Sequence, residues 1–278
     1  MTVGTRPSTL SLVWSQTKYQ NIIFFRNPTA AFFTIFFPLM IFLVFSLIFG
    51  NEVIEALGVT TAQYYAPAMA VFAAVSATYT NLAVTTAYQR DEGILKRIKG
   101  TPLPPVVYMS GKIISAVMIA VLSVVVMMSI GVLFYGVTIY AGTLAAASLT
   151  FLVGVGSFAA LGLMIAALVS SGEAATAITN ATLLPLAFIS GVFVPPSGDA
   201  PAWLDTVASI FPLKHFVDPF VAAFNPLSTG AQFHWDSLAI MALWGIGGMI
   251  VALRFFHWEI PTGRTKKSRR TRKAAAEA

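Results

Sequence analysis

The sequence has no cysteine, only 3 histidines and few charged residues, which make up 10% of its 278 residues. Without cysteine the chain has neither disulfides nor thiolate metal sites. So few histidines leave little from which a clustered catalytic or metal site could be built. No segment reads G-x-x-x-x-G-K-[ST], the loop that cradles ATP phosphates. These absences argue against a disulfide scaffold, a thiolate metalloprotein, a membrane-embedded enzyme and an ATPase.

Apolar residues dominate instead, at 57% of the sequence with a mean hydropathy of +0.78. Such a chain has too little polar surface to face water as a globule, so lipid is its expected solvent. Six apolar stretches are each near or above the roughly 20 residues that cross about 30 Å of hydrocarbon as a helix. We predict an all-α membrane protein with six spans, at about 30–49, 64–88, 106–135, 143–169, 174–194 and 237–256.

The cations are distributed unevenly between the two sides of these spans. The connections after the first, third and fifth spans contain only Lys214, whereas Arg90, Lys96, Lys112 and the cluster 264–273 fall on the other side. The positive-inside rule therefore predicts that both termini are cytoplasmic. A basic cytoplasmic tail faces anionic lipid, so we expect membrane lipids and not nucleic acid as its partners.

Ahead of the first span, residues 10–25 have apolar side chains at nearly helical spacing with Lys18 among them. This pattern predicts an amphipathic helix in the cytoplasmic interface, ended by Asn27 and Pro28.

Within the first span, Pro38 removes a backbone donor and is expected to kink the helix. The fourth span is rich in glycine and alanine, which predicts close helix packing.

The cytoplasmic link between the second and third spans contains the most informative segment. Residues 91–99 are predicted to form a short helix, with acids at its amino end and bases at its carboxyl end, terminated by Gly100 and Pro102. An apolar ridge of Ile94, Leu95 and Ile98 runs among the charges and suits docking in a groove of another protein. A plain solvated loop with positive-inside bias remains the alternative.

Hydroxyl and amide side chains occur within the second and fifth spans. Such groups in hydrocarbon usually bond one helix to another, and the alternative is that they line a polar route for a substrate. The candidates for such a route are Thr78, Asn81, Thr85, Thr179 and Asn180.

The connection from Pro195 to His234 is too long for a simple turn. It holds two apolar pieces separated by Pro212, and two such pieces could form a re-entrant or interfacial hairpin that enters from outside. Its named residues are Phe211, Pro212, His215 and Asp218. A single histidine near a single aspartate indicates a local hydrogen-bonded pair and not a metal or catalytic site.

With these segments in view, the chain resembles the membrane subunit of type-2 ATP-binding-cassette exporters over almost its whole length. The segments that carry the resemblance are Phe25-Arg-Asn-Pro28, Phe37-Pro-Leu39, Arg90–Pro102, Ser190-Gly-Val-Phe-Val-Pro-Pro196 and Phe211-Pro-Leu-Lys-His215. The resemblance implies that 10–26 is a connecting helix and that the segments after the fifth span are re-entrant. It also implies that the cytoplasmic link between the second and third spans is the coupling helix, which docks on an ATPase. The implied coupling residues are Arg90, Asp91, Glu92, Gly93, Ile94, Leu95, Lys96, Arg97, Gly100, Thr101 and Pro102.

The resemblance further implies a permease of the bacterial cytoplasmic membrane that works as a pair, with two cytoplasmic ATPase subunits. ATP and Mg would be bound by that partner, and this chain would hold no cofactor. We expect a connecting helix over 1–28, one membrane domain over 29–260 and a basic tail over 261–278. The expected cargo is an amphipathic or hydrophobic drug, lipid or glycolipid moved out of the cytoplasm.

Two other functions remain open. A secondary transporter ordinarily keeps an ionisable side chain inside its spans, and the central parts of the six stretches have no Asp, Glu, His or Lys. A membrane scaffold that transports nothing would differ from an exporter in that no ATPase co-purifies with it.

Overall fold

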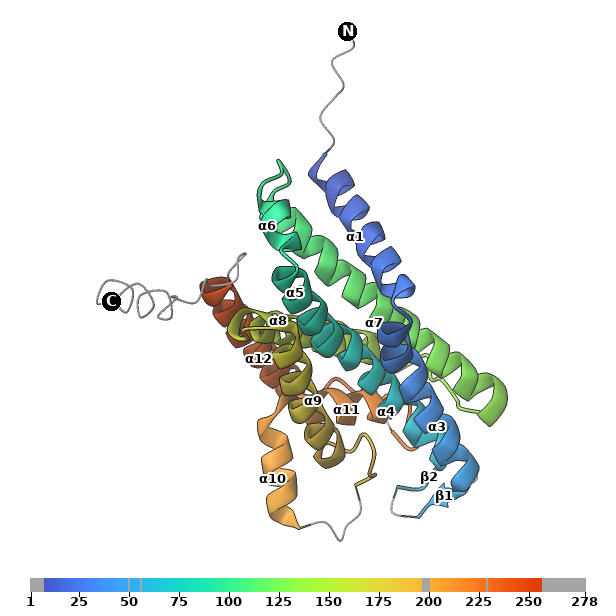
Figure 1. The fold of residues 1–278 in the computed structure, drawn as a ribbon. Helices are drawn as coiled ribbons and strands as arrows, with labels where there is room; N and C mark the ends of the chain where they lie inside the picture. The colour runs from blue at the N-terminus through green and yellow to red at the C-terminus, as the bar shows by residue number, and fades with distance from the viewer. Residues whose placement is uncertain (1–7, 50, 56, 197–200, 229, 257–278) are drawn as a thin grey trace, which may run out of the picture.

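Helices form nearly all of the regular structure, as Figure 1 shows. The computed structural model describes residues 8–49, 51–55, 57–196, 201–228 and 230–256. Within these residues, five helical segments are long and apolar enough to cross a membrane. They are Pro28–Ile48, Thr61–Asp91, α7 (Pro105–Tyr135), α8 (Leu144–Leu168) and α12 (Trp235–Phe255). The all-helical prediction is confirmed, and five of the six predicted spans correspond to these segments.

The fifth predicted span is a helix, but a shorter and more polar one than expected. This helix, α9 (Gly172–Ile189), has 18 residues that include Glu173 and Asn180, and it is not among the five segments above. The chain leaves the helical conformation after Ile189, where Gly191 has a φ of 79°. The predicted extension of this span to residue 194 is therefore wrong.

The first two spanning segments are each interrupted by a π-helical turn. The first consists of α2 (Pro28–Ala31), η1 (Phe32–Phe36) and α3 (Phe37–Ile48), and the second of α4 (Thr61–Val75), η2 (Ser76–Asn81) and α5 (Leu82–Asp91). The widened turn η1 directly precedes Pro38, whose missing N–H disturbs the helical ladder there. The two π-helical turns contact each other, so the irregular parts of both segments meet inside the bundle.

The amino-terminal segment forms α1 (Thr9–Arg26), as predicted. It runs along α7 (Figure 1). The two helices approach most closely at Gly111, where a methyl group would lie 2.5 Å from Cβ of Gln16. The residues that α1 buries are Thr17, Gln20 and Phe24, whereas Trp14 and other apolar side chains point outward. The face of α1 that packs on the bundle is therefore partly polar.

The core of the bundle is built around α4 and α8, whose side chains are mostly buried. The helix α12 packs along α8. The expected close packing at the small residues of the fourth span is borne out at Gly162 of α8, where a methyl group would lie 2.7 Å from the carbonyl oxygen of Tyr79. After α9, the helices α10 (Ala202–Ile210) and α11 (Pro212–Ala222) form the two apolar pieces expected from the sequence. The second of them, α11, packs against α4, α8 and α12.

Short elements lie at both ends of the bundle. The short helix α6 (Ile94–Lys99) and the start of α1 lie at one end, while α10 and a small hairpin lie at the other (Figure 1). The hairpin pairs β1 (Val53–Ile54) with β2 (Val59–Thr60) in antiparallel fashion, with Val53 opposite Thr60. The connections that follow the first and fifth predicted spans thus lie at one end of the bundle, and the connection that follows the second lies at the other, as expected for a chain that crosses back and forth. The predicted tail 261–278 lies outside the described residues.

Candidate functional site

The segment predicted as one coupling helix is divided in two. The helix α5 continues to Asp91, the chain turns at Glu92 and Gly93, and α6 begins at Ile94. Gly93 has a φ of 71°, a left-handed conformation that suits glycine. The prediction of a single helix over 91–99 is therefore wrong, because the acids belong to the end of α5 and not to the start of α6.

Arg90 faces the interior and not a partner. Its guanidinium donates hydrogen bonds to the carbonyl oxygens of Ala166, at 2.7 Å, and Val169, at 2.6 Å. These carbonyls end α8, where the last turn has no intrahelical donors and the helix dipole favours a cation. Arg90 is only 4% exposed. Arg90 therefore joins the end of α5 to the end of α8, and its part in coupling stays a prediction.

Asp91 anchors the start of α9, a helix that is distant in the sequence. One of its carboxylate oxygens accepts a hydrogen bond of 2.6 Å from the N–H of Gly172, the first residue of α9. A carboxylate at a helix amino terminus is favoured by the dipole and satisfies an otherwise unpaired donor. The ring of Tyr88 covers the same glycine, where a methyl group would lie 2.5 Å from the ring. Asp91 thus stabilises the start of α9.

The third residue of this junction, Gln89, points toward α7. Its Oε1 accepts a hydrogen bond of 2.7 Å from Nζ of Lys112 and a second, short one from the hydroxyl of Tyr108. Three consecutive residues at the end of α5 therefore reach three different elements, namely α7, the end of α8 and the start of α9. We call Gln89, Arg90 and Asp91 the α5 clamp.

The helix α6 follows the clamp directly and is exposed on its basic side. Lys96, Arg97 and Lys99 are exposed, and α6 ends where predicted, before Gly100. Leu95 is fully buried within the chain, so the predicted ridge is not free as a whole. The ridge prediction is therefore corrected: its central side chain attaches α6 to this chain, and the outer surface of α6 is mainly charged.

The residues proposed to line a substrate path are dispersed. Thr78 and Thr179 are fully buried, and their hydroxyls donate to carbonyls of their own helices, those of Ala74 and Ala175. Asn180 is exposed on the outer face of α9. Each of these two hydroxyls therefore bonds within its own helical segment and does not join one helix to another.

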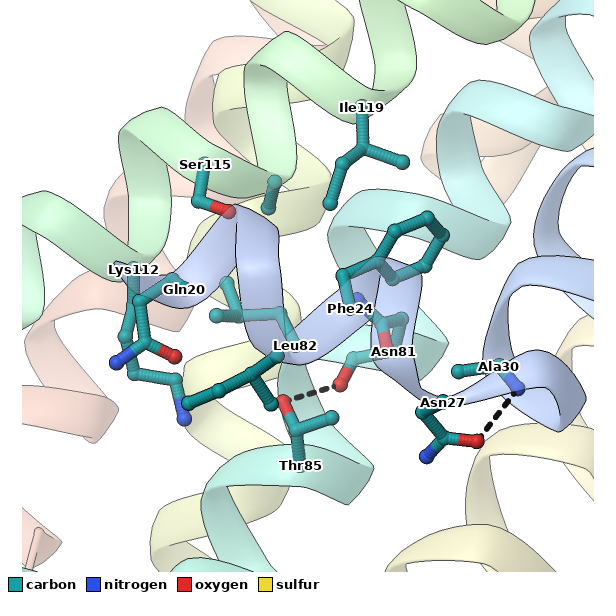
Figure 2. A pocket seen from close by; sticks show the side chains of 12 residues that line it. Gln20, Phe24, Asn27, Ala30, Asn81, Leu82, Thr85, Lys112, Ser115 and Ile119 are labelled. Atoms are coloured by element: carbon teal, nitrogen blue, oxygen red, sulfur yellow. Dashed lines mark hydrogen bonds between the residues drawn. The ribbon is translucent and has the colours of Figure 1, made fainter. Parts of the chain in front are cut away.

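The remaining two, Asn81 and Thr85, lie together. The Thr85 hydroxyl donates to the carbonyl of Asn81 at 2.7 Å, and both residues line a cavity of about 30 Å³ between α1, α5 and α7. Figure 2 shows this cavity with Lys112 and Gln20 at one end of it.

Lys112 is a buried residue that the sequence did not single out as part of a site. It was grouped with the cations of the cytoplasmic side, yet it lies inside α7 and is 3% exposed. Its position as the sole charged residue of the apolar stretch 106–135 was the signal available in the sequence. The absence of Asp, Glu, His and Lys from the central parts of the spans does not extend to their ends.

At the opposite end of the bundle, His215 and Asp218 do not form the predicted pair. His215 interacts through Nε2 with the carbonyl of Ser209, at 2.8 Å, and through Nδ1 with the hydroxyl of Ser237, at 3.1 Å. Asp218 pairs instead with Lys214 at 3.0 Å. These contacts tie α11 to α10 and α12. Phe211, between α10 and α11, stacks on Trp244 of α12, while the neighbouring Pro212 starts α11 and is buried.

Lys214 also pairs with Asp205 of α10, at 2.8 Å. Burial alone would lower the pKa of Lys214, but the hydrogen bonds and charges of Asp205 and Asp218 together raise it. Burial raises the pKa of the Asp218 carboxyl, and the charge of Asp205 adds to this, outweighing the effect of Lys214. Lys214 therefore links α10 to α11 through its ion pairs with Asp205 and Asp218.

Among the described residues, no three His, Asp or Glu side chains are grouped to hold a metal ion. The family model described as ABC-2 type transporter matches residues 11–225. A comparison with curated proteins found no match. The matched residues include α1, the α5 clamp, α6 and α11, and they end before α12.

Proposed function

The chain belongs to the ABC-2 type transporter family, and from this membership we propose that it is the permease subunit of an ATP-driven exporter. A cytoplasmic ATP-binding-cassette subunit would hydrolyse ATP and hold its Mg, since this sequence has no phosphate-binding loop of its own. The permease would move an amphipathic or hydrophobic molecule, such as a drug, lipid or glycolipid, outward from the cytoplasm or inner leaflet.

One observation carries this proposal, namely the attachment of α6 to the bundle. The exposed basic helix directly follows three residues that are fixed to α7, α8 and α9. A force applied to α6 by a partner would thus act on three other elements through short hydrogen bonds. A solvated loop would need neither the clamp nor the buried Leu95.

We further propose six spans, with α9 as the fifth, and both termini in the cytoplasm. The amide of Asn180 is exposed on α9, and an unpaired amide in lipid is costly. That cost supports a second permease copy covering this face of α9. With α6 on the cytoplasmic side, α10 and α11 would lie on the outer side, where α11 enters between α4, α8 and α12 as a re-entrant helix.

A secondary transporter is the second candidate, because Lys112 is an ionisable side chain buried in a spanning helix. Its position weighs against that role. Lys112 lies about 10 Å along the helix from the start of α7, at 1.5 Å per residue, and not at the midplane where coupling sites are usually found.

The direct test is capture of the ATPase subunit by α6. The variant in which Lys96 and Arg97 are both replaced by Glu should retain at least tenfold less of the ATPase subunit in co-purification, because α6 presents these charges outward. Lys18→Glu is the matched control, since Lys18 is exposed on α1 near the same end. Equal capture by both variants and the unaltered chain, each equally stable to heat, would contradict the proposal and favour the membrane scaffold.

A further inference from the structure

The cavity beside Lys112 has hydrogen-bond donors without matching acceptors. Lys112 Nζ has three protons, and the acceptor it contacts is Gln89 Oε1, which it shares with Tyr108. None of the acidic groups in the described part of the chain lies within 4.0 Å of it. A buried ammonium without a counter-ion is costly, so the surroundings of Lys112 are suited to receive an anion.

A second donor belongs to the same cavity. Gln20 of α1 is 7% exposed, and its amide faces the Tyr108 hydroxyl, although Nε2 makes no hydrogen bond of standard geometry within the described structure. Gln20 and Lys112 lie at the same end of the cavity in Figure 2. Other polar groups line the remaining wall, those of Asn27, Asn81, Thr85 and Ser115. A cation and a donor amide beside polar neighbours match the chemistry of a phosphate group, which is rich in acceptor oxygens.

The depth of Lys112 indicates where such a phosphate comes from. With 31 residues, α7 is about 46 Å long, which exceeds a hydrocarbon thickness of about 30 Å by about 8 Å at each end. Lys112 lies about 10 Å from the start of α7. It is therefore close to the boundary between hydrocarbon and headgroups, the level at which lipid phosphates begin.

We propose that Lys112 and Gln20 form a binding site for the phosphate of a membrane lipid in the leaflet that α1 faces. The cavity of about 30 Å³ admits a phosphate oxygen and not a whole headgroup, so the lipid sits at the opening with one oxygen inside. Apolar side chains beside the cavity, including Ile23 and Ile119, lie next to the acyl chains. The site requires neither ATP nor a partner, and it would stand even if the transport proposal failed.

The test measures lipid binding to the full chain, delipidated in a neutral detergent. Native mass spectrometry counts the bound molecules during titration with dioleoylphosphatidylglycerol, with dioleoylglycerol, which has the same chains without phosphate, and with inorganic phosphate. The unaltered chain should retain one phosphatidylglycerol at least tenfold more tightly than Lys112→Met. The control Lys18→Met, which removes an exposed cation from α1, should stay within twofold of the unaltered chain.

The three ligands distinguish the sources of the anion. Equal affinity for dioleoylglycerol, or unchanged phosphatidylglycerol binding by Lys112→Met, would overturn the site. Binding of inorganic phosphate as tight as that of the lipid would assign the site to a soluble anion and overturn the lipid assignment.

A second variant, Gln20→Glu, tests the site even if Lys112→Met does not fold. It places a carboxylate beside Lys112, so its melting temperature should rise while phosphatidylglycerol binding falls at least tenfold. A lower melting temperature with unchanged lipid binding would show that the cavity does not favour an anion.

Discussion

Replacement of Arg90 by Met should destabilise the protein strongly, because Arg90 bridges two carbonyls at the end of α8. The variant loses hydrogen bonds of 2.7 and 2.6 Å from a charged donor. Hydrogen bonds to charged groups contribute about 1.5–3 kcal/mol each, and the carbonyls of Ala166 and Val169 would be left without this donor. We therefore expect a loss of about 3–5 kcal/mol in the free energy of unfolding.

Arg90→Lys keeps the charge but cannot present two parallel donors, so it should recover only part of this loss. Arg97→Met is the matched control, because Arg97 is an exposed arginine on α6, and it should not measurably change stability. The assay is equilibrium unfolding in mixed micelles with increasing dodecyl sulfate, followed by tryptophan fluorescence. Unfolding of Arg90→Met within about 1 kcal/mol of the unaltered chain would refute the bridging role.

Two further predictions concern the link between α10 and α11 and the orientation of the chain in the membrane. Lys214→Met should cost about 0.5–1 kcal/mol at pH 7, a modest figure because Asp205 is largely exposed. Since the folded-state pKa of Lys214 is raised, its contribution is complete below the unfolded-state pKa and lost as the pH rises through the folded-state value. Unfolding curves of the variant and the unaltered chain should thus converge in strong alkali, and a difference that persists there would rule out the charge as its cause. In the cysteine-free chain, a cysteine at Glu55 should react with an impermeant maleimide on intact cells, whereas one at Lys96 should react only after permeabilisation. The reverse labelling pattern would invert the proposed orientation.

The spanning helices could be predicted because hydrophobic length alone indicates a membrane span. Close packing of α8 could also be predicted from the small residues of the fourth span, although these residues do not say which helices pack against it. The end of α5 could not. The order of acids and bases in 91–99 favours one helix, but Asp91 is drawn to Gly172, which is distant in the sequence. Local charge patterns carry no information about such a partner.

Lys112 illustrates the same limit for the candidate site. Its sequence position near the start of a span suggests a cytoplasmic cation, and the packing of α1 and α5 on α7 buries it. Leu95 is a similar case, because spacing shows that it lies on an apolar ridge but not whether the ridge faces this chain or another. For Lys112 the deciding contacts are with elements distant in the sequence, namely α1 and α5.

The central claim is that movement of an amphiphile through this permease is driven by ATP. It is tested most directly in vesicles that contain the chain and its ATPase subunit, with a fluorescent phosphatidylglycerol as the probe. Movement of the probe between leaflets should require hydrolysable ATP and both subunits, and it should persist when a protonophore collapses the proton gradient. Movement driven by an imposed pH gradient, with this chain alone and no ATP, would contradict the account and establish a secondary transporter.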